Sequence, residues 1–219
     1  MHQAAGIVLA SGSPRRRDLV TWLGFPVVGR AVDVDERRLP EESPARYVRR
    51  LAEQKARAGA IGAPAGWVVV GGDTAVVFQG RVLGKPRDGV EARHMLEALR
   101  GRPHQVLSGV AVYRPADEAL WSTVVGTRVF MRAMSDAELE AYIASGDPMD
   151  KAGAYAIQNQ DFHPVERIEG CYANVVGLPL CHLAQGLAAL LGPPRHQVAL
   201  QCQRAFGYNC PIHERVFPV

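Results

Sequence analysis

The sequence is short of lysine, long apolar runs and paired cysteines, and each shortage excludes a class of protein. No apolar stretch among the 219 residues approaches the roughly 20 needed to cross a bilayer. The first ten residues lack the basic flank and apolar length of a secretion signal. The net charge of +3 does not demand nucleic acid, and the short basic clusters favour small anionic ligands. We therefore expect a cytoplasmic globular protein without a membrane partner.

The cysteines contain no CxxC pair, which argues against a zinc site or a disulfide framework. They are Cys171, Cys181, Cys202 and Cys210. Cys202 and Cys210 lie near His196 and His213, so a metal site or a bridge in this tail stays open on spacing alone. Free thiols are the favoured prediction, because the tail is rich in turn-forming residues.

Only three of the 25 basic residues are lysines, namely Lys55, Lys85 and Lys151. A compact ammonium approaches a phosphate or a metal-bound oxygen as a point charge, whereas a guanidinium fork is larger. The lysines are therefore candidates for contact with phosphates. Chance is the alternative explanation of their small number.

The segment from Leu9 to Arg17 reads LASGSPRRR and places three arginines in the first turn of a helix. After a short strand, Ser13 is the predicted N-cap and Pro14 the first helical residue. A helix N-terminus is already partially positive, so three arginines there are unfavourable unless an anion binds among them. A phosphate is the expected anion. An exposed basic turn is the alternative, since each such charge costs only about 0.3 to 1 kcal/mol at a screened surface.

Two further patterns place charged side chains beside apolar segments. An amphipathic helix over 44–59 carries Lys55 at the edge of its apolar face, where the lysine points into a cleft or snorkels to solvent. The apolar stretch 67–78 is interrupted by GGDT at 71–74, where Asp73 must be solvated, paired or metal-bound. The glycines allow a bulge or a close ligand; a tight turn between two strands is the alternative.

The remaining periodicities predict alternating strands and helices, as in an α/β protein. Strands are expected over 26–32, 106–113, 122–130 and 165–168, with a hairpin turn at 79–80. Helices are expected over 88–101, 135–146 and 177–191, the last being the final helix. In the predicted loop 150–160, Gln158 reads a base edge or satisfies backbone groups, and the loop alone favours the second role.

In chain order, the motifs SGSPRRR, LAxxKA, GGDT, LGKP, GDPMDKAGAYAIQ and YANVVGLPL resemble those of the Maf family of nucleoside triphosphate pyrophosphatases, also labelled septum formation inhibitors. The match spans about Ile7 to Leu191. The resemblance implies a long twisted mixed β-sheet with helices on both faces, two lobes around a nucleotide cleft, and a homodimer. Residues 1–192 are then the pyrophosphatase domain, and residues 193–219 form a tail of unknown role.

The resemblance also implies hydrolysis between the α and β phosphorus atoms with Mg²⁺ or Mn²⁺. It makes Asp73 the proton acceptor and Glu36 an acidic residue near the metal, so both are candidate metal ligands. Lys55 and Lys85 join them as catalytic candidates. The expected substrate-binding residues are Ser11, Ser13, Arg15, Arg16, Thr74, Lys151 and Gln158.

Within the family, the branch that acts on dTTP and UTP is most similar, because Arg15, Thr74 and Gln158 match its specificity positions. The chain departs from that branch at Ala156 and Asn159, where the branch usually reads GIQG after a glycine, and we expect a shift in loop shape. Modified pyrimidine triphosphates are further candidate substrates. The alternatives are a pyrophosphatase for 7-methyl-GTP or another nucleotide, a nucleotide-binding regulator of septum formation, and a nucleic-acid binder.

Overall fold

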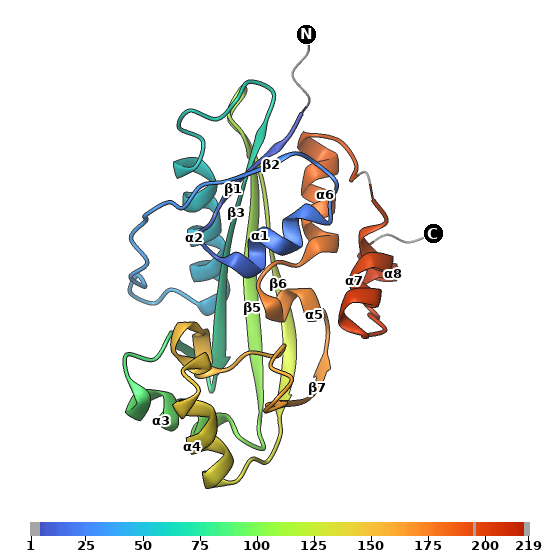
Figure 1. The fold of residues 1–219 in the computed structure, drawn as a ribbon. Coiled ribbons are helices and arrows are strands. Elements are labelled where there is room, and N and C mark those ends of the chain that lie inside the picture. The colour runs from blue at the N-terminus through green and yellow to red at the C-terminus, as the bar shows by residue number, and fades with distance from the viewer. Residues whose placement is uncertain (1–4, 195, 217–219) are drawn as a thin grey trace.

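The computed structural model describes residues 5–194 and 196–216 as a twisted β-sheet with helices on both faces (Figure 1). Residues 1–4, 195 and 217–219, which fall in the predicted domain and tail, lie outside this description. The strands are β1 (Ile7–Ala10), β2 (Val27–Gly29), β3 (Val68–Phe78), β4 (Arg81–Leu83), β5 (Pro103–Arg114), β6 (Ala119–Met131) and β7 (Val165–Glu169). The helices are α1 (Pro14–Thr21), α2 (Pro44–Ala58), α3 (Gly89–Leu99), α4 (Asp136–Ala144), α5 (Tyr172–Val176), α6 (Leu180–Leu190), α7 (Val198–Phe206) and α8 (His213–Val216), with short 3₁₀ turns η1 (Asp147–Asp150) and η2 (Ala152–Ala154).

The sheet is mixed, as predicted. In the described residues it has seven strands in the order β2-β1-β3-β5-β6-β7, with β4 also paired to β3. Strand β1 runs parallel to β2 and β3, and the other pairs are antiparallel. On one side of β3, pairing with β1 reaches only to Gly71, and pairing with β4 begins at Val76. This edge of residues 72–75 therefore has no strand partner among the described residues.

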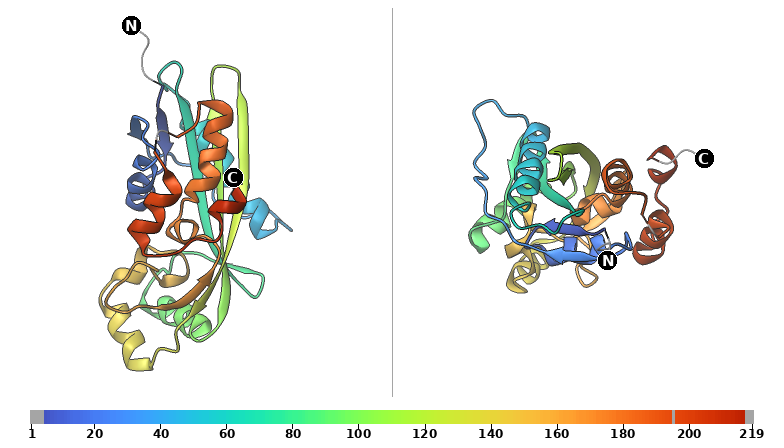
Figure 2. Two further views of the ribbon diagram at one scale, coloured as in Figure 1. Left: turned by 90° about the vertical axis from the view of Figure 1, so that its right-hand side faces the viewer. Right: turned by 90° about the horizontal axis from the view of Figure 1, so that it is seen from above.

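Alternate residues of the central strands face two different layers, because side chains alternate across a strand. Helix α2 covers one face and packs Ala52 and Ala56 against Val8 and Val69. Helices α1, α5, α6 and α7 cover the opposite face (Figure 2). A further apolar cluster joins α3 and α4 to one end of β5 and β6. The central strands are thus buried on both faces.

Helix α2 lies very close to the sheet because two glycines face it. A Cβ atom at Gly71 or at Gly109 would lie 2.1 Å from a backbone carbonyl oxygen of α2. Gly109 pairs with Asp73 in the register of β3 and β5. The glycines therefore let α2 carry Lys55 to the neighbourhood of Asp73.

The GGDT segment does not interrupt the sheet, so the alternative of a tight turn between two strands is wrong. Strand β3 runs from Val68 to Phe78, and its register with β5 is continuous from Val69 to Val77. Asp and Gly have poor intrinsic strand propensity. Here the close packing of α2 requires glycine, and an ion pair satisfies the carboxylate of Asp73.

Three further expectations need correction. The strand predicted over 26–32 is the three-residue β2. The helix α5 was not predicted, because its N-cap residue Cys171 makes no side-chain cap and it has only five residues. Helix α6 is not the final helix, since α7 and α8 follow it, and Gln185 on α6 donates a hydrogen bond of 2.9 Å to the carbonyl oxygen of Val216.

The described part of the chain contains no helix long and apolar enough to span a bilayer. The four cysteines are free and buried. Within residues 5–194 and 196–216, no group of three or more His, Cys, Asp or Glu side chains is arranged to hold a metal ion. The division at residue 192 stays a proposal.

Candidate active site

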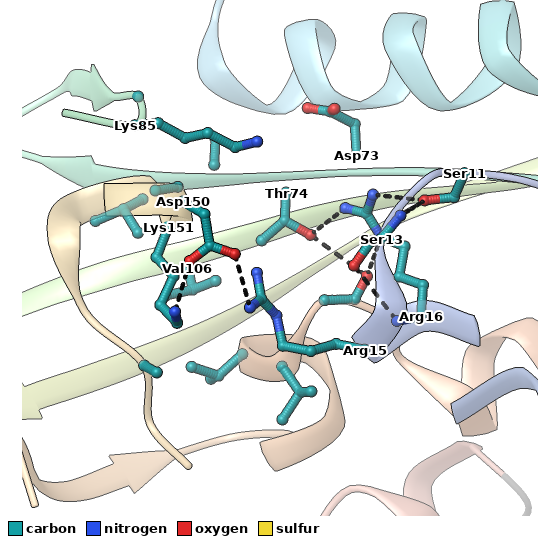
Figure 3. Close-up of a pocket in the computed structure, with 18 of the residues that line it drawn as sticks. Ser11, Ser13, Arg15, Arg16, Asp73, Thr74, Lys85, Val106, Asp150 and Lys151 are labelled. Carbon is teal, nitrogen blue, oxygen red and sulfur yellow. Dashed lines mark hydrogen bonds and ion pairs between the residues drawn. The ribbon is translucent and has the colours of Figure 1, made fainter. Parts of the chain in front are cut away.

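A cavity of about 790 Å³ opens beside the unpaired edge of β3 (Figure 3). Its size is typical of a small-molecule site. It collects every predicted site residue from the β1–α1 turn, α1, the β2–α2 loop, α2, β3 and the segments after β4, η1 and η2. These residues are Ser11, Ser13, Arg15, Arg16, Glu36, Lys55, Asp73, Thr74, Lys85, Lys151 and Gln158.

The N-terminus of α1 forms one wall of the cavity. Ser13 caps the helix, as predicted, and its Oγ accepts a hydrogen bond of 3.5 Å from the backbone N–H of Arg16. The Arg15 guanidinium lies 3.7 Å from the carboxylate of Asp150 on the facing loop (Figure 3). Arg17 is exposed and does not line the cavity, so the expectation of three convergent arginines is wrong. Successive side chains on a helix diverge by about 100° and cannot all face one ligand.

Arg16 joins three segments of the cavity wall. Its Nε donates to the carbonyl oxygen of Gly177 at 2.8 Å, its Nη2 to Thr74 Oγ1 at 2.9 Å, and its Nη1 to Ser11 Oγ at 3.4 Å. Thr74 Oγ1 also lies 2.8 Å from Ser108 Oγ. Burial lowers the pKa of Arg16, but a guanidinium remains charged in proteins. Arg16 thus supplies a fixed positive charge whose position is set by the fold.

A lysine lies between two carboxylates on the α2 side of β3. Lys55 Nζ is 2.7 Å from Asp73 Oδ1 and 2.7 Å from Glu36 Oε1. Lys55 and Asp73 are each 9% exposed, so the alternative of a snorkelling lysine is wrong. Burial raises the pKa of Asp73, while the positive charges of Lys55 and Arg16 oppose the rise. A buried ion pair adds little stability relative to apolar packing, and a perturbed carboxylate in a cleft is a candidate for chemistry.

Glu36 reaches this pair from the loop between β2 and α2. Tyr47 Oη donates a hydrogen bond of 2.9 Å to the Glu36 carbonyl oxygen. The Arg50 guanidinium pairs with the buried carboxylate of Glu42 at 2.7 Å and donates to the Arg37 carbonyl oxygen at 3.0 Å. The hydrogen bonds from Arg50 hold the pKa of Glu42 at about 2. These contacts fix the loop against α2 and keep Glu36 at the cavity.

The two carboxylates that meet at Lys55 are ligands of the type that binds a divalent cation. Mg²⁺ prefers oxygen ligands and is commonly held by one or two carboxylates together with substrate phosphates. Asp73 and Glu36 offer such oxygens on one side of the cavity. The donor set is too small for a metal held by protein alone, so substrate oxygens would have to complete it.

The other two lysines differ in their partners. Lys85 points into the cavity and makes no ion pair or hydrogen bond with any described residue (Figure 3). The Lys151 ammonium, by contrast, lies 2.9 Å from Asp147 Oδ1 and 2.6 Å from Asp150 Oδ1. Lys85 is therefore the freer cation, while the charge of Lys151 is already balanced.

Gln158 lies on the loop after η2 and is exposed at the cavity. Its side chain has no hydrogen-bond partner in the described part of the chain, so it does not satisfy the backbone of the loop. The loop is held against β3 and β4 by Gly153, whose N–H donates to the Gly84 carbonyl oxygen at 3.0 Å. Gly153 has a φ of 71°, and a Cβ atom there would lie 2.9 Å from Val76 Cγ1. Glycine is therefore required at this contact.

Three groups of the cavity were missed by the sequence analysis. The carbonyl oxygen of Gly177 carries no side-chain signal at all. Tyr47 falls on the apolar face of a helix, where a core role is the ordinary interpretation. Asp150 lies within a quoted motif, but only the fold shows that it faces Arg15 across the cavity.

Comparison with known proteins gives both family and structural relatives. The family described as Maf-like protein matches residues 6–190. A dTTP/UTP pyrophosphatase of Geobacter metallireducens is 45% identical over 190 residues, which cover 87% of this chain and 98% of the relative. A dTTP/UTP pyrophosphatase of Anaeromyxobacter dehalogenans (strain 2CP-C) is 49% identical over 183 residues, which cover 83% and 92%. The crystal structure of a nucleoside-triphosphatase / dITP/XTP pyrophosphatase from Mycobacterium abscessus aligns with a TM-score of 0.44 at 14% identity, over 98% of this chain and 100% of that one. That structural likeness is too distant to bear on function.

Proposed function

Since the chain belongs to the Maf family, we propose that it is a nucleoside triphosphate pyrophosphatase that hydrolyses dTTP and UTP to the monophosphate and pyrophosphate. The observation that carries this proposal is the meeting of cationic side chains and a buried carboxylate in one cavity of nucleotide size. Phosphoryl transfer needs such an arrangement, because catalysis depends chiefly on positioning and charge stabilisation.

The triphosphate binds among the cations. Arg15 lines the cavity at the start of α1, and the helix dipole favours an anion there. Arg16 and Lys55 supply charges held in place by hydrogen bonds and ion pairs. Lys85 reaches the phosphates from the opposite side, because its ammonium has no competing partner among the described residues. These charges stabilise the negative charge that develops on the leaving pyrophosphate.

Asp73 accepts a proton from the attacking water. The water oxygen forms a bond to the α phosphorus, and the bond from that phosphorus to the bridging oxygen breaks. A carboxylate whose pKa is raised by burial is a stronger base than an exposed one, which suits this step at neutral pH. Lys55 keeps the Asp73 carboxylate ionised and oriented.

Asp73 and Glu36 would hold Mg²⁺ or Mn²⁺ together with phosphate oxygens of the substrate. When bound, the cation supplies further neutralisation of the phosphate charge. Lys55 links both carboxylates to α2.

Gln158 contacts the base. Its amide carries both a donor and an acceptor, which match the carbonyl and N–H groups of uracil or thymine. Its lack of a hydrogen-bond partner among the described residues supports this role, as does its place at the edge of the cavity. We place the enzyme in the cytoplasm, where nucleoside triphosphates are formed, and expect a homodimer, which light scattering of the purified protein tests.

Replacing Asp73 with asparagine tests the catalytic assignment. The Asp73→Asn variant should lose turnover of UTP by about 10²- to 10⁴-fold, because the proton acceptor is absent. Its affinity for the non-hydrolysable α,β-methylene analogue of UTP, measured by calorimetry without added metal, should change little. Asp117→Asn, which removes an exposed carboxylate from the β5–β6 turn, is the control. Full activity in Asp73→Asn would contradict the role of Asp73.

A further inference from the structure

Asp147 in η1 is the centre of a hydrogen-bonded group beside the cavity. Its Oδ2 accepts from Tyr142 Oη at 2.7 Å and from Asn159 Nδ2 at 3.1 Å, and its Oδ1 lies 2.9 Å from Lys151 Nζ. Burial alone would raise the pKa of Asp147, but the hydrogen bonds from Lys151, Tyr142 and Asn159 outweigh it and lower this pKa. Asp147 is therefore an anion that ties three other residues together at neutral pH.

Asn159 closes the loop that contains Gln158. Besides its bond to Asp147, its Oδ1 accepts from the backbone N–H groups of Asp161 at 3.1 Å and Phe162 at 2.9 Å. One side chain thus fixes the chain on both sides of the turn. These contacts make Asn159 the residue that closes the turn.

Tyr142 anchors the same loop to the apolar core. Its ring is fully buried and packs against Phe162, with ring centroids 4.7 Å apart. Its Oη donates to Asp147 and accepts from the backbone N–H of Ala156 at 2.9 Å. Ala156 lies two residues before Gln158. The hydroxyl therefore sets the path of the backbone immediately before the side chain that faces the base.

We propose that Tyr142, Asp147 and Asn159 form a clamp that positions Gln158 and so determines how well the enzyme distinguishes among nucleobases. The clamp residues are positioning residues, because they act through the loop 151–158. The proposal rests on the proposed function and assigns to these three residues a part in substrate selection. Lys151 belongs to the same group as a counter-ion of Asp147.

The clamp should act on recognition of the base more than on cleavage. None of its three residues lines the cavity, and none contacts Asp73, Lys55 or Arg16. Loosening the loop would let Gln158 occupy more orientations, so fewer bound molecules would have the base correctly paired. Arg16 and Lys55, which other segments hold in place, would be unaffected.

The test uses two substitutions that remove clamp hydrogen bonds at different points. Tyr142→Phe deletes only the hydroxyl, and Asn159→Ala removes the amide at a partly exposed position, so a folding defect in one leaves the other informative. Tyr208→Phe is the matched control, because Tyr208 lies in the tail away from the cavity and its Oη donates to the Gly170 carbonyl oxygen at 3.1 Å. Steady-state hydrolysis of UTP, dTTP and CTP gives KM and kcat, and competition with inorganic tripolyphosphate gives the affinity for phosphates alone.

Both clamp variants should raise KM for UTP and dTTP about three- to tenfold, as expected for loss of a hydrogen bond, with kcat changed less than twofold. The ratio of kcat/KM for UTP to kcat/KM for CTP should decrease. The inhibition constant of tripolyphosphate should stay unchanged. The proposal is overturned if KM, kcat and base preference match those of Tyr208→Phe. It is also overturned if kcat and the affinity for tripolyphosphate both fall while KM rises. Failure of the wild-type protein to hydrolyse any of the three nucleotides would instead refute the proposed function.

Discussion

Replacing Gly109 with alanine tests whether the close packing of α2 creates the active site. The added Cβ would lie 2.1 Å from the Val48 carbonyl oxygen, whereas ordinary contact begins at 3.4 Å, so α2 would have to retreat by roughly 1.3 Å. The obstructing atom belongs to the helix backbone and cannot rotate away. Overpacking of this kind costs about 1 to 3 kcal/mol of unfolding free energy. Because α2 carries Lys55, the same movement would lengthen the 2.7 Å contact between Lys55 and Asp73.

Urea unfolding of Gly109→Ala should therefore show a lower midpoint, and its kcat for UTP should fall by up to about 100-fold, the cost of misplacing a catalytic group by about 1 Å. Gly126→Ala is the control in the neighbouring strand β6. Its Cβ would lie 3.2 Å from Leu107 Cδ2, a side-chain end that can move, so we expect a change within about 0.5 kcal/mol. Equal stability and activity of the two variants would refute the reasoning.

Two further predictions concern stability and phosphate binding. Burial lowers the pKa of His104 to about 4, whereas the unfolded chain takes up this proton near 6.5. The unfolding free energy should therefore fall by up to about 3 kcal/mol as the pH drops from 6.5 towards 4, and urea titrations of His104→Gln should lack this component. Lys85→Met should raise the inhibition constant of tripolyphosphate about tenfold, and Lys151→Met less than threefold, because only Lys151 is already paired. The first prediction is contradicted if the unfolding free energy of His104→Gln falls with pH as steeply as that of the wild-type protein. The second is contradicted if the two lysine substitutions have equal effects in the competition assay.

Local rules predicted the parts of the fold that local contacts determine. Ser13 caps α1 as expected, and the helix predicted from residue 135 is α4, which begins at a capping box of Ser135 and Glu138. The hairpin at Gln79 and Gly80 also forms where the turn residues indicated. In each case a few neighbouring residues carry the whole signal.

The errors arose where distant packing decides the structure. Intrinsic propensity favours a turn at GGDT, but Gly71 is needed for contact with α2, and Asp73 is paired with a lysine 18 residues away. The grouping of Arg17 with Arg15 and Arg16 was instead an error of local geometry. The turn of the helix separates them, and only Arg15 and Arg16 reach the cavity.

The family motifs identified the candidate site residues, but most of the contacts that these residues make are visible only in the fold. The aspartates that pair with Lys151 lie one and four residues before it, but only the fold shows that Lys85 has no partner among the described residues. The same holds for the carbonyl oxygen of Gly177, which orients Arg16. Such partnerships decide which cation can serve the substrate.

Identifying the products formed from UTP tests the central claim most directly. The purified protein is incubated with UTP and Mg²⁺ or Mn²⁺, with a chelator in a parallel sample, and nucleotides and phosphates are separated by ion-exchange chromatography. The account predicts UMP and pyrophosphate in equal amounts, formed only with metal. Formation of UDP and orthophosphate, or no hydrolysis of UTP and dTTP, would contradict it.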